Sequence, residues 1–170
     1  RGDYIGGLAG LARGEISDVT MSGDVSGTAA NTVYGSNVIN DGNSQGTGGL
    51  IGIPYGPMEN VEVTGTHVKG YQRVGGVSGY SNENTSENIR VGKEEEPDAD
   101  NAKRYSVFVE GTSYISGTGG RGTSGSYSTT VNYYKDVHVK DVRVSASGSE
   151  ASGVGQVVQV EDSEVSGSYI

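Results

Sequence analysis

A short glycine phrase recurs along this chain and constrains its fold more than any other feature. The phrase is Gly-Gly, a hydrophobic residue, any residue and Gly, and it occupies 6–10, 48–52 and 75–79. Degraded copies begin at Gly119 and Gly153. Self-similarity at a fixed period of about 20–50 residues is typical of repeat architectures, in which like units stack on one another. We therefore expect a stack of similar units rather than one irregular core.

A second phrase follows each glycine phrase. It is an Asp or Asn, then two apolar residues that flank one polar residue, and its copies occupy 18–21, 60–63, 88–91, 136–139 and, in worn form, 162–165. The spacing from Gly6 to Asp18 and from Gly48 to Asn60 is 12 residues in both cases. A third phrase, a hydrophobic residue followed by a polar residue and Gly, closes some repeats at 24–27, 67–70 and 114–117. The shortest repeat, from Gly48 to Gly75, spans 27 residues.

These phrases predict short strands joined by tight corners. Apolar and polar residues alternate in Val61-Glu62-Val63-Thr64, which is the period of a strand with one buried face. The chain has 22 Val and only 3 Leu, a balance that favours strands over helices. We predict an all-β fold, a right-handed parallel β-solenoid of about five coils, as one domain over 1–170. Longer repeats carry insertions at about 28–46 and 92–106.

Glycine and Asx residues fit the corners of such coils. Corners often need positive φ or close backbone approach, which Gly tolerates, and Asp and Asn side chains bond to nearby backbone and accept the left-handed region. Aligned Asn or Asp residues of successive coils could form a side-chain ladder. The competing interpretation of the pattern is a glycine-rich β-sandwich built from ordinary hairpins, but the repeated 12-residue spacing favours the solenoid.

Composition excludes several classes of protein. The net charge is −9, with 12 Lys and Arg against 21 Asp and Glu, so the basic face that nucleic-acid binding needs is not expected. No apolar run is long enough to predict a membrane span. The chain has no Cys, so disulfides, thiolate metal sites and cysteine nucleophiles are excluded.

The glycine phrases, each with an Asx-led strand phrase 12 or 13 residues on, resemble the GLUG-motif repeats. Such repeats occur in bacterial and archaeal surface and secreted proteins, including the non-catalytic part of bacterial immunoglobulin A1 proteases. The resemblance is good for the first three repeats and poor after them, where Arg121 and Val154 break the pattern. It implies an extracellular β-solenoid in an adhesive or cell-surface role, and it implies no catalytic residues.

The insertion at 92–106 is rich in Asp and Glu, and we call it the acidic insertion. It is the best candidate for a metal site. Calcium takes several hard oxygen ligands from a flexible loop, and Asp98, Asp100 and Asn101 could supply them. A solvated charged loop is the simpler interpretation, and we favour it. No cofactor is expected otherwise.

Tyrosine is the main candidate for partner binding, because it presents a flat apolar face with a polar tip that suits carbohydrate stacking and protein interfaces. Of the 11 Tyr in the chain, seven are predicted near corners or insertions: Tyr71, Tyr80, Tyr105, Tyr114, Tyr127, Tyr133 and Tyr134. Packing of these rings on the coils is an equally good interpretation. The two histidines, His67 and His138, are predicted as exposed strand residues.

The functional prediction is a non-enzymatic, extracellular structural or adhesive element of a cell surface. Its partners would be further copies of the chain, which stack into a filament or sheath, or a cell-surface protein or glycan. The alternative is a glycan- or protein-binding module of a larger secreted protein or enzyme. A polysaccharide-processing enzyme on the same fold is a third interpretation, and it would need acidic groups close together on one face.

Overall fold

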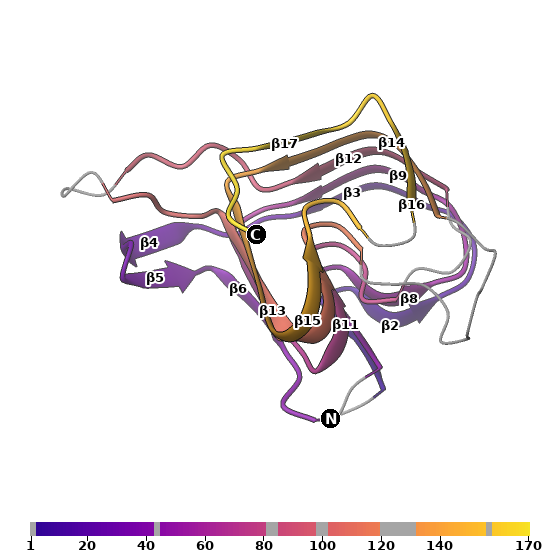
Figure 1. The fold of residues 1–170 in the computed structure, drawn as a ribbon. Helices are drawn as coiled ribbons and strands as arrows, with labels where there is room; N and C mark the ends of the chain where they lie inside the picture. The colour runs from indigo at the N-terminus through magenta and orange to yellow at the C-terminus, as the bar shows by residue number, and fades with distance from the viewer. Residues whose placement is uncertain (1–2, 43–44, 81–84, 98–101, 120–131, 156–157) are drawn as a thin grey trace.

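The fold is all-β and is built almost entirely from parallel strands (Figure 1). In the computed structural model, residues 3–42, 45–80, 85–97, 102–119, 132–155 and 158–170 are described. These ranges hold 17 strands and no helix. Of the 13 strand pairings among them, 12 are parallel, and the exception joins β4 to β5. The β-sandwich alternative is therefore wrong, because its strands would pair antiparallel through hairpins.

One sheet collects the strands that the Asx-led phrase predicts, and we call it the Asx sheet. Its members are β3 (Ile16–Met21), β9 (Met58–Val63), β12 (Thr85–Val91), β14 (Asn132–Lys140), β16 (Val158–Glu161) and β17 (Glu164–Ser166). The first four lie side by side in chain order, and both β16 and β17 pair with β14 (Figure 1). Met21, Val63, Val91, Val139 and Val165 share one register position, so each repeat lies on the next without slippage.

A second sheet forms the other side of the stack and folds sharply on itself. Its strands are β6 (Ser36–Ile39), β10 (Thr66–Lys69), β13 (Val107–Ser116), β15 (Val142–Ser152), β1 (Tyr4–Gly6), β7 (Gly46–Gly48) and β11 (Gln72–Gly75). The first halves of β13 and β15 stack with β10, and the second half of β13 stacks with β11. The chain therefore turns back within β13 and β15, which makes them 10 and 11 residues long rather than short strands as predicted.

The glycine phrases stack on one another at a third position. Here β2 (Ala9–Ala12) pairs with β8 (Ile51–Pro54), and single bridges continue the column through Ser78, Gly119 and Gly155. Glycine is required because the backbones approach closely. A Cβ on Gly49 would overlap the carbonyl oxygen of Gly76 in the next repeat.

The insertions depart from the stack. The one predicted at 28–46 begins with a two-stranded antiparallel hairpin, β4 (Val25–Thr28) and β5 (Asn31–Tyr34), and then rejoins the second sheet through β6. The other, predicted at 92–106, has no strand in its described residues, and both segments project to the left in Figure 1. Arg104 Nη1 donates a hydrogen bond to the carbonyl oxygen of Gly27 at 3.5 Å, so the two insertions are in contact.

The core is a set of apolar columns that run along the stack. Val68, Val109 and Val144 follow one another in register and are at most 1% exposed. A single repeat could not bury these side chains, because each is covered by the same position of the repeats on either side. Burial of apolar area and the parallel backbone ladders therefore stabilise the stack together.

Candidate interaction surfaces

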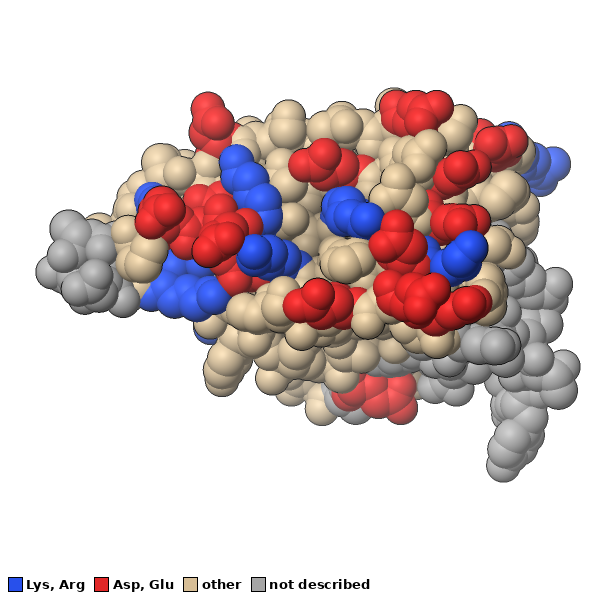
Figure 2. All heavy atoms as spheres, turned by 90° about the horizontal axis from the view of Figure 1, so that it is seen from above, with Lys and Arg blue, Asp and Glu red and all other residues tan. Residues whose placement is uncertain are grey.

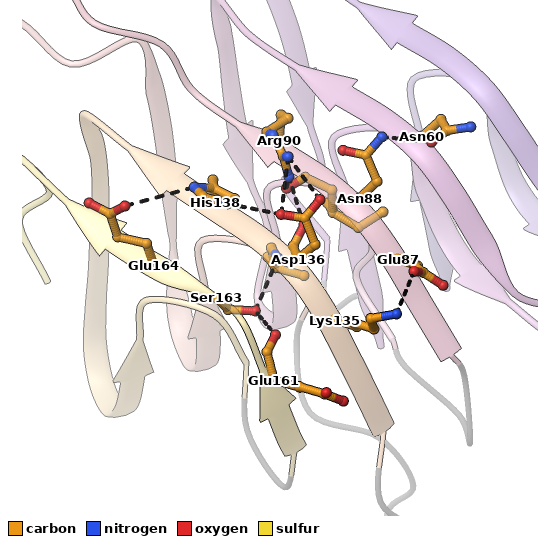
Figure 3. Close-up of polar contacts among 12 residues, drawn as sticks. Asn60, Glu87, Asn88, Arg90, Lys135, Asp136, His138, Glu161, Ser163 and Glu164 are labelled. Carbon is orange, nitrogen blue, oxygen red and sulfur yellow. Dashed lines mark hydrogen bonds and ion pairs between the residues drawn. The ribbon is translucent and has the colours of Figure 1, made fainter.

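The polar face of the Asx sheet is organised by an Asx ladder, and most of its contacts are drawn in Figure 3. The five ladder positions, Asp18, Asn60, Asn88, Asp136 and Asp162, all have φ between 48° and 55°. Asn60 Nδ2 donates to Asp18 Oδ1 at 2.9 Å, and Asn88 Nδ2 donates to Asn60 Oδ1 at 2.6 Å. The predicted ladder of aligned Asx side chains is therefore present over the first three repeats.

Ion pairs replace the amide ladder in the later repeats. Arg90 Nη2 lies 3.0 Å from Asp136 Oδ2, and Arg90 Nη1 donates to the Asp136 carbonyl oxygen at 2.7 Å. This guanidinium holds the pKa of Asp136 below its usual value, and His138 Nε2, 3.0 Å from Asp136 Oδ1, contributes in the same direction. On its other side, His138 Nδ1 lies 3.9 Å from Glu164 Oε2, so the contacts continue to β17 (Figure 3).

A second row of contacts joins strands of this sheet nearer to their N-terminal ends. Lys135 Nζ lies 2.9 Å from Glu87 Oε1 on the neighbouring strand, which raises the pKa of Lys135. Tyr133 donates its hydroxyl to Glu161, and this bond raises the pKa of Tyr133. Figure 2, which looks down on the upper side of Figure 1, shows acidic and basic side chains interspersed there rather than gathered by sign.

Two carboxylates of the Asx sheet, Glu87 and Asp136, lack the surroundings of a general acid. A general acid of the glycosidase type needs a carboxyl group whose pKa is raised, usually beside a second carboxylate. Instead, Glu87 and Asp136 each face a cation, and the pKa of Asp136 is lowered. Among the described residues, no three His, Asp or Glu side chains are grouped as metal ligands would be.

A column of planar side chains runs along the outside of the second sheet. It consists of Tyr34, His67, Phe108, Arg143 and Tyr169. The His67 and Phe108 rings are stacked with centroids 4.9 Å apart, and Arg143 lies 5.1 Å over Phe108 and 6.0 Å over Tyr169. Because these planar groups contact one another, the column connects successive repeats. Burial of Tyr34 at one end of the column raises its pKa to about 12.

The acidic insertion contacts the stack through a buried carboxylate, Asp141, and through the exposed ion pair of Glu94 with Lys140 at 3.0 Å. Asp141, at the corner between β14 and β15, accepts hydrogen bonds from Lys103 Nζ at 2.7 Å and from the Glu95 backbone N–H at 3.1 Å. Its side chain is 5% exposed. The predicted calcium ligands Asp98, Asp100 and Asn101 lie outside the described residues.

The predicted tyrosines do not gather on one face. Tyr134 is 1% exposed and points into the core, whereas its neighbour Tyr133 is on the outside of β14. The others are dispersed over the molecule. Tyr80 lies against Arg73, and Tyr105 lies by Lys103. Tyr114 is half-buried in β13, and Tyr71 is exposed at the turn before β11. Tyr127 lies outside the described residues.

Both histidines are on outward strand positions, as predicted, but each contacts a carboxylate. His67 Nε2 lies 3.1 Å from Glu110 Oε1, and His138 contacts Asp136 as described above. Glu110 belongs to the next repeat, so the stacking register brings it to His67, whereas Asp136 lies two residues before His138 on the same strand.

The two ends of the stack expose side chains that are buried elsewhere in the same columns. Val139 is fully buried, but Val165, which follows it in register on the last repeat, is 43% exposed. At the opposite end, Leu8 of the first glycine phrase is 61% exposed, whereas Leu50 at the same position of the second phrase is 2% exposed. The outer edges of β1, β2, β3, β16 and β17 have no strand partner within the described ranges.

No family model matches the chain, and no curated protein or solved structure was found to be similar to it. In the portion of the chain that the structure describes, no helix has the length and apolar character needed to cross a bilayer.

Proposed function

We propose that the chain is a right-handed parallel β-solenoid of five coils that acts as an extracellular structural or adhesive element of a cell surface. We further propose that it has no catalytic activity and that its end coils stack on those of other copies to form a filament or sheath. The observation that carries the proposal is the exposure, at both ends of the stack, of columns that the inner repeats bury.

The two ends are complementary in register. Val165 ends the column that begins at Met21, and Val160 ends the column that begins at Ile16. A second copy placed head to tail would therefore set apolar side chains on apolar side chains and pair the strand edges at the usual ~4.8 Å spacing. Because the two contacting surfaces differ, each added copy leaves a new free end, and the product is an open fibre.

Three further features support a structural role. The paired charges of the Asx sheet and the stacked rings on the second sheet join repeat to repeat. Glu87 and Asp136 on the Asx sheet face cations rather than other carboxylates, which suits stability and not proton transfer. The resemblance of the first three repeats to GLUG-motif repeats supports a location at the outer surface of a cell.

The assembly is tested with variants at the ends of the stack. Light scattering and negative-stain electron microscopy of the purified chain should show fibres whose length increases with protein concentration. Leu8→Lys and Val165→Lys should abolish the fibres, because each places a charge in the end contact. Val33→Lys is the matched control, since Val33 is 59% exposed on the hairpin strand β5 and away from the end columns.

Circular dichroism would confirm that each variant is folded. Dispersed monomers at all concentrations in the unaltered chain, or fibres that persist in both end variants, would refute the assembly. The proposed location is tested separately, by labelling intact source cells with an antibody to the chain, and labelling that needs permeabilised cells would refute it.

A further inference from the structure

A groove of about 230 Å³ lies on the outside of the second sheet, where the chain turns back between β10 and β11 and within β13 and β15. Its side chains come from repeats 2, 3 and 4, counted from the N-terminus, and they are Lys69, Glu110, Thr112, Ser145 and Ser147. Lys69, Glu110 and Ser145 occupy one register position of successive repeats. We call this feature the tip groove.

One additional residue in the fourth repeat contributes to the wall of the tip groove. Gly111 pairs with Ala146 and Ser113 pairs with Ser149, so one residue of β13 lies opposite two residues of β15, Ser147 and Gly148. This β-bulge carries Ser147 into the wall of the groove, where its Oγ donates to the Gly111 carbonyl oxygen at 3.4 Å. Bulges are over-represented beside functional sites, where they re-aim a side chain.

Glycine backbone forms the remainder of the lining. Gly70 and Gly111 lie at equivalent turns of successive repeats, and the Gly70 N–H donates to the Glu110 carbonyl oxygen at 3.1 Å. A side chain at Gly111 would meet Ile115 and the Gly70 carbonyl oxygen, so glycine is needed for the turns to approach this closely. The groove is thus formed by two regular turns and one irregular turn.

The chemistry of the lining selects the class of ligand. Every side chain in the groove is polar, so an apolar molecule would gain little by entering it. Lys69 Nζ and Glu110 Oε1 lie 3.2 Å apart, so their charges offset each other and the groove has no net charge to attract a phosphate or another ion. A molecule rich in hydroxyls is suited to both groups, because a hydroxyl donates to a carboxylate and accepts from an ammonium group.

The size and surroundings of the groove fit one or two rings of a sugar chain. Its volume lies below the roughly 300–1,000 Å³ of ordinary small-molecule pockets. Tyr71 adjoins it, since the Tyr71 carbonyl oxygen accepts a hydrogen bond from the N–H of Thr112 at 2.9 Å, and this tyrosine is 40% exposed. We propose that the tip groove binds an uncharged saccharide, with Glu110 and Lys69 contacting neighbouring hydroxyls of one ring. This binding is independent of the end-to-end assembly proposed above.

The experiment is a saccharide array followed by calorimetry and NMR titration with the best uncharged saccharide. The unaltered chain should bind, and the backbone amide signals of Gly70, Gly111 and Ser147 should shift. Glu110→Gln removes the carboxylate at nearly constant shape, and Ser145→Tyr fills the groove. Each should weaken binding at least tenfold, or by about 1.4 kcal/mol.

Glu87→Gln is the matched control, because Glu87 also pairs with a lysine, at 2.9 Å, but does so on the Asx sheet. It should bind like the unaltered chain. An array on which no saccharide or only uronic acids bind would overturn the proposal. Undiminished affinity in Glu110→Gln or in Ser145→Tyr would do the same, with circular dichroism showing that both variants are folded.

Discussion

Asn60 donates a hydrogen bond from Nδ2 to Oδ1 of Asp18 at 2.9 Å, across 42 residues of sequence, while both residues hold left-handed backbone conformations. The same residue type thus serves two purposes. It accepts a φ near 53° that most side chains resist, and its amide connects one repeat to the previous one. All five ladder positions share the positive φ that Asp and Asn tolerate, whereas the amide link between repeats is donated by Asn60 and Asn88.

Substitution of Asn60 should separate the two purposes. Asn60→Ala loses both the hydrogen bond and the tolerance of positive φ, and it should lower the free energy of unfolding by about 1–2 kcal/mol. Asn60→Gly loses only the hydrogen bond and should be less destabilising. Urea unfolding measures both, with Glu59→Ala on the same exposed face as the control, expected within about 0.5 kcal/mol of the unaltered chain. Equal losses in the two Asn60 variants would show that the backbone conformation is not what the residue supplies.

The glycine phrase makes a sharper prediction. Gly49→Ala should destabilise the fold by about 3 kcal/mol or more, because the new Cβ would overlap the carbonyl oxygen of Gly76 and neither backbone can move without breaking the stack. Gly14→Ala is the comparison, since a Cβ there would meet nothing within 4 Å and only the φ of 102° opposes it. Thermal unfolding should rank Gly14→Ala well above Gly49→Ala in stability. The reverse order would remove close packing as the reason for the glycine pairs.

The sequence allowed the repeat and its main columns to be predicted because they depend on local residue types. Alternating Val residues, the glycine pairs and the Asx corners each reflect a requirement of one residue and its immediate neighbours. Parallel stacking follows from them, since a repeat of 27 residues is long enough to return to its start. The Asx ladder was predictable for the same reason.

The third phrase was grouped wrongly, because short strands of similar pattern occur at different places of the repeat. Val68 belongs to the column of Val109 and Val144, Ile115 belongs to the column of Val74, and Val25 lies in the hairpin outside the stack.

One feature of the sequence indicates the tip groove, but it can be recognised only when the strand register is known. Val68 and Val74 are six residues apart, as are Val109 and Ile115, but Val144 and Ala151 are seven apart. The extra residue is the bulge. Without knowing which residues share a column, this difference cannot be distinguished from ordinary variation in loop length.

Asp136 should give the fold a dependence on acidic pH. Its pKa is lowered by the hydrogen bonds from Arg90, so its stabilising contribution is complete above the unfolded-state pKa of 3.8 and is lost as pH falls through the lower folded-state pKa. The difference in urea midpoint between the unaltered chain and Asp136→Asn should therefore shrink below about pH 4. Glu59→Gln removes the same charge from the same sheet and should show a smaller change. A midpoint difference for Asp136→Asn that is independent of pH would contradict the role of Arg90.

Asp141 should control how firmly the acidic insertion is attached. Asp141→Asn keeps the size of the side chain but loses the charge that holds Lys103, and it should cost about 1–3 kcal/mol because the carboxylate is nearly buried. Trypsin should then cut more rapidly after Lys93, Lys103 or Arg104, which mass spectrometry of the fragments would show. Glu59→Gln, which removes an exposed carboxylate from β9, is the control. Unchanged cleavage in Asp141→Asn would mean that other contacts hold the insertion.

The two adjacent tyrosines of β14 test the orientation of the Asx sheet. Successive residues of a strand face opposite sides, so Tyr134 fills the core at 1% exposure while Tyr133 contacts Glu161 outside. Tyr134→Ala should leave a cavity between repeats and cost about 3–5 kcal/mol, comparable to loss of a buried Phe. Tyr133→Ala should be much less destabilising, since its hydroxyl bond is exposed to solvent. Urea unfolding compares them directly. If Tyr133→Ala were the more damaging change, β14 would be in the opposite register, and the columns that place Val165 at the end of the stack would have to be reassigned.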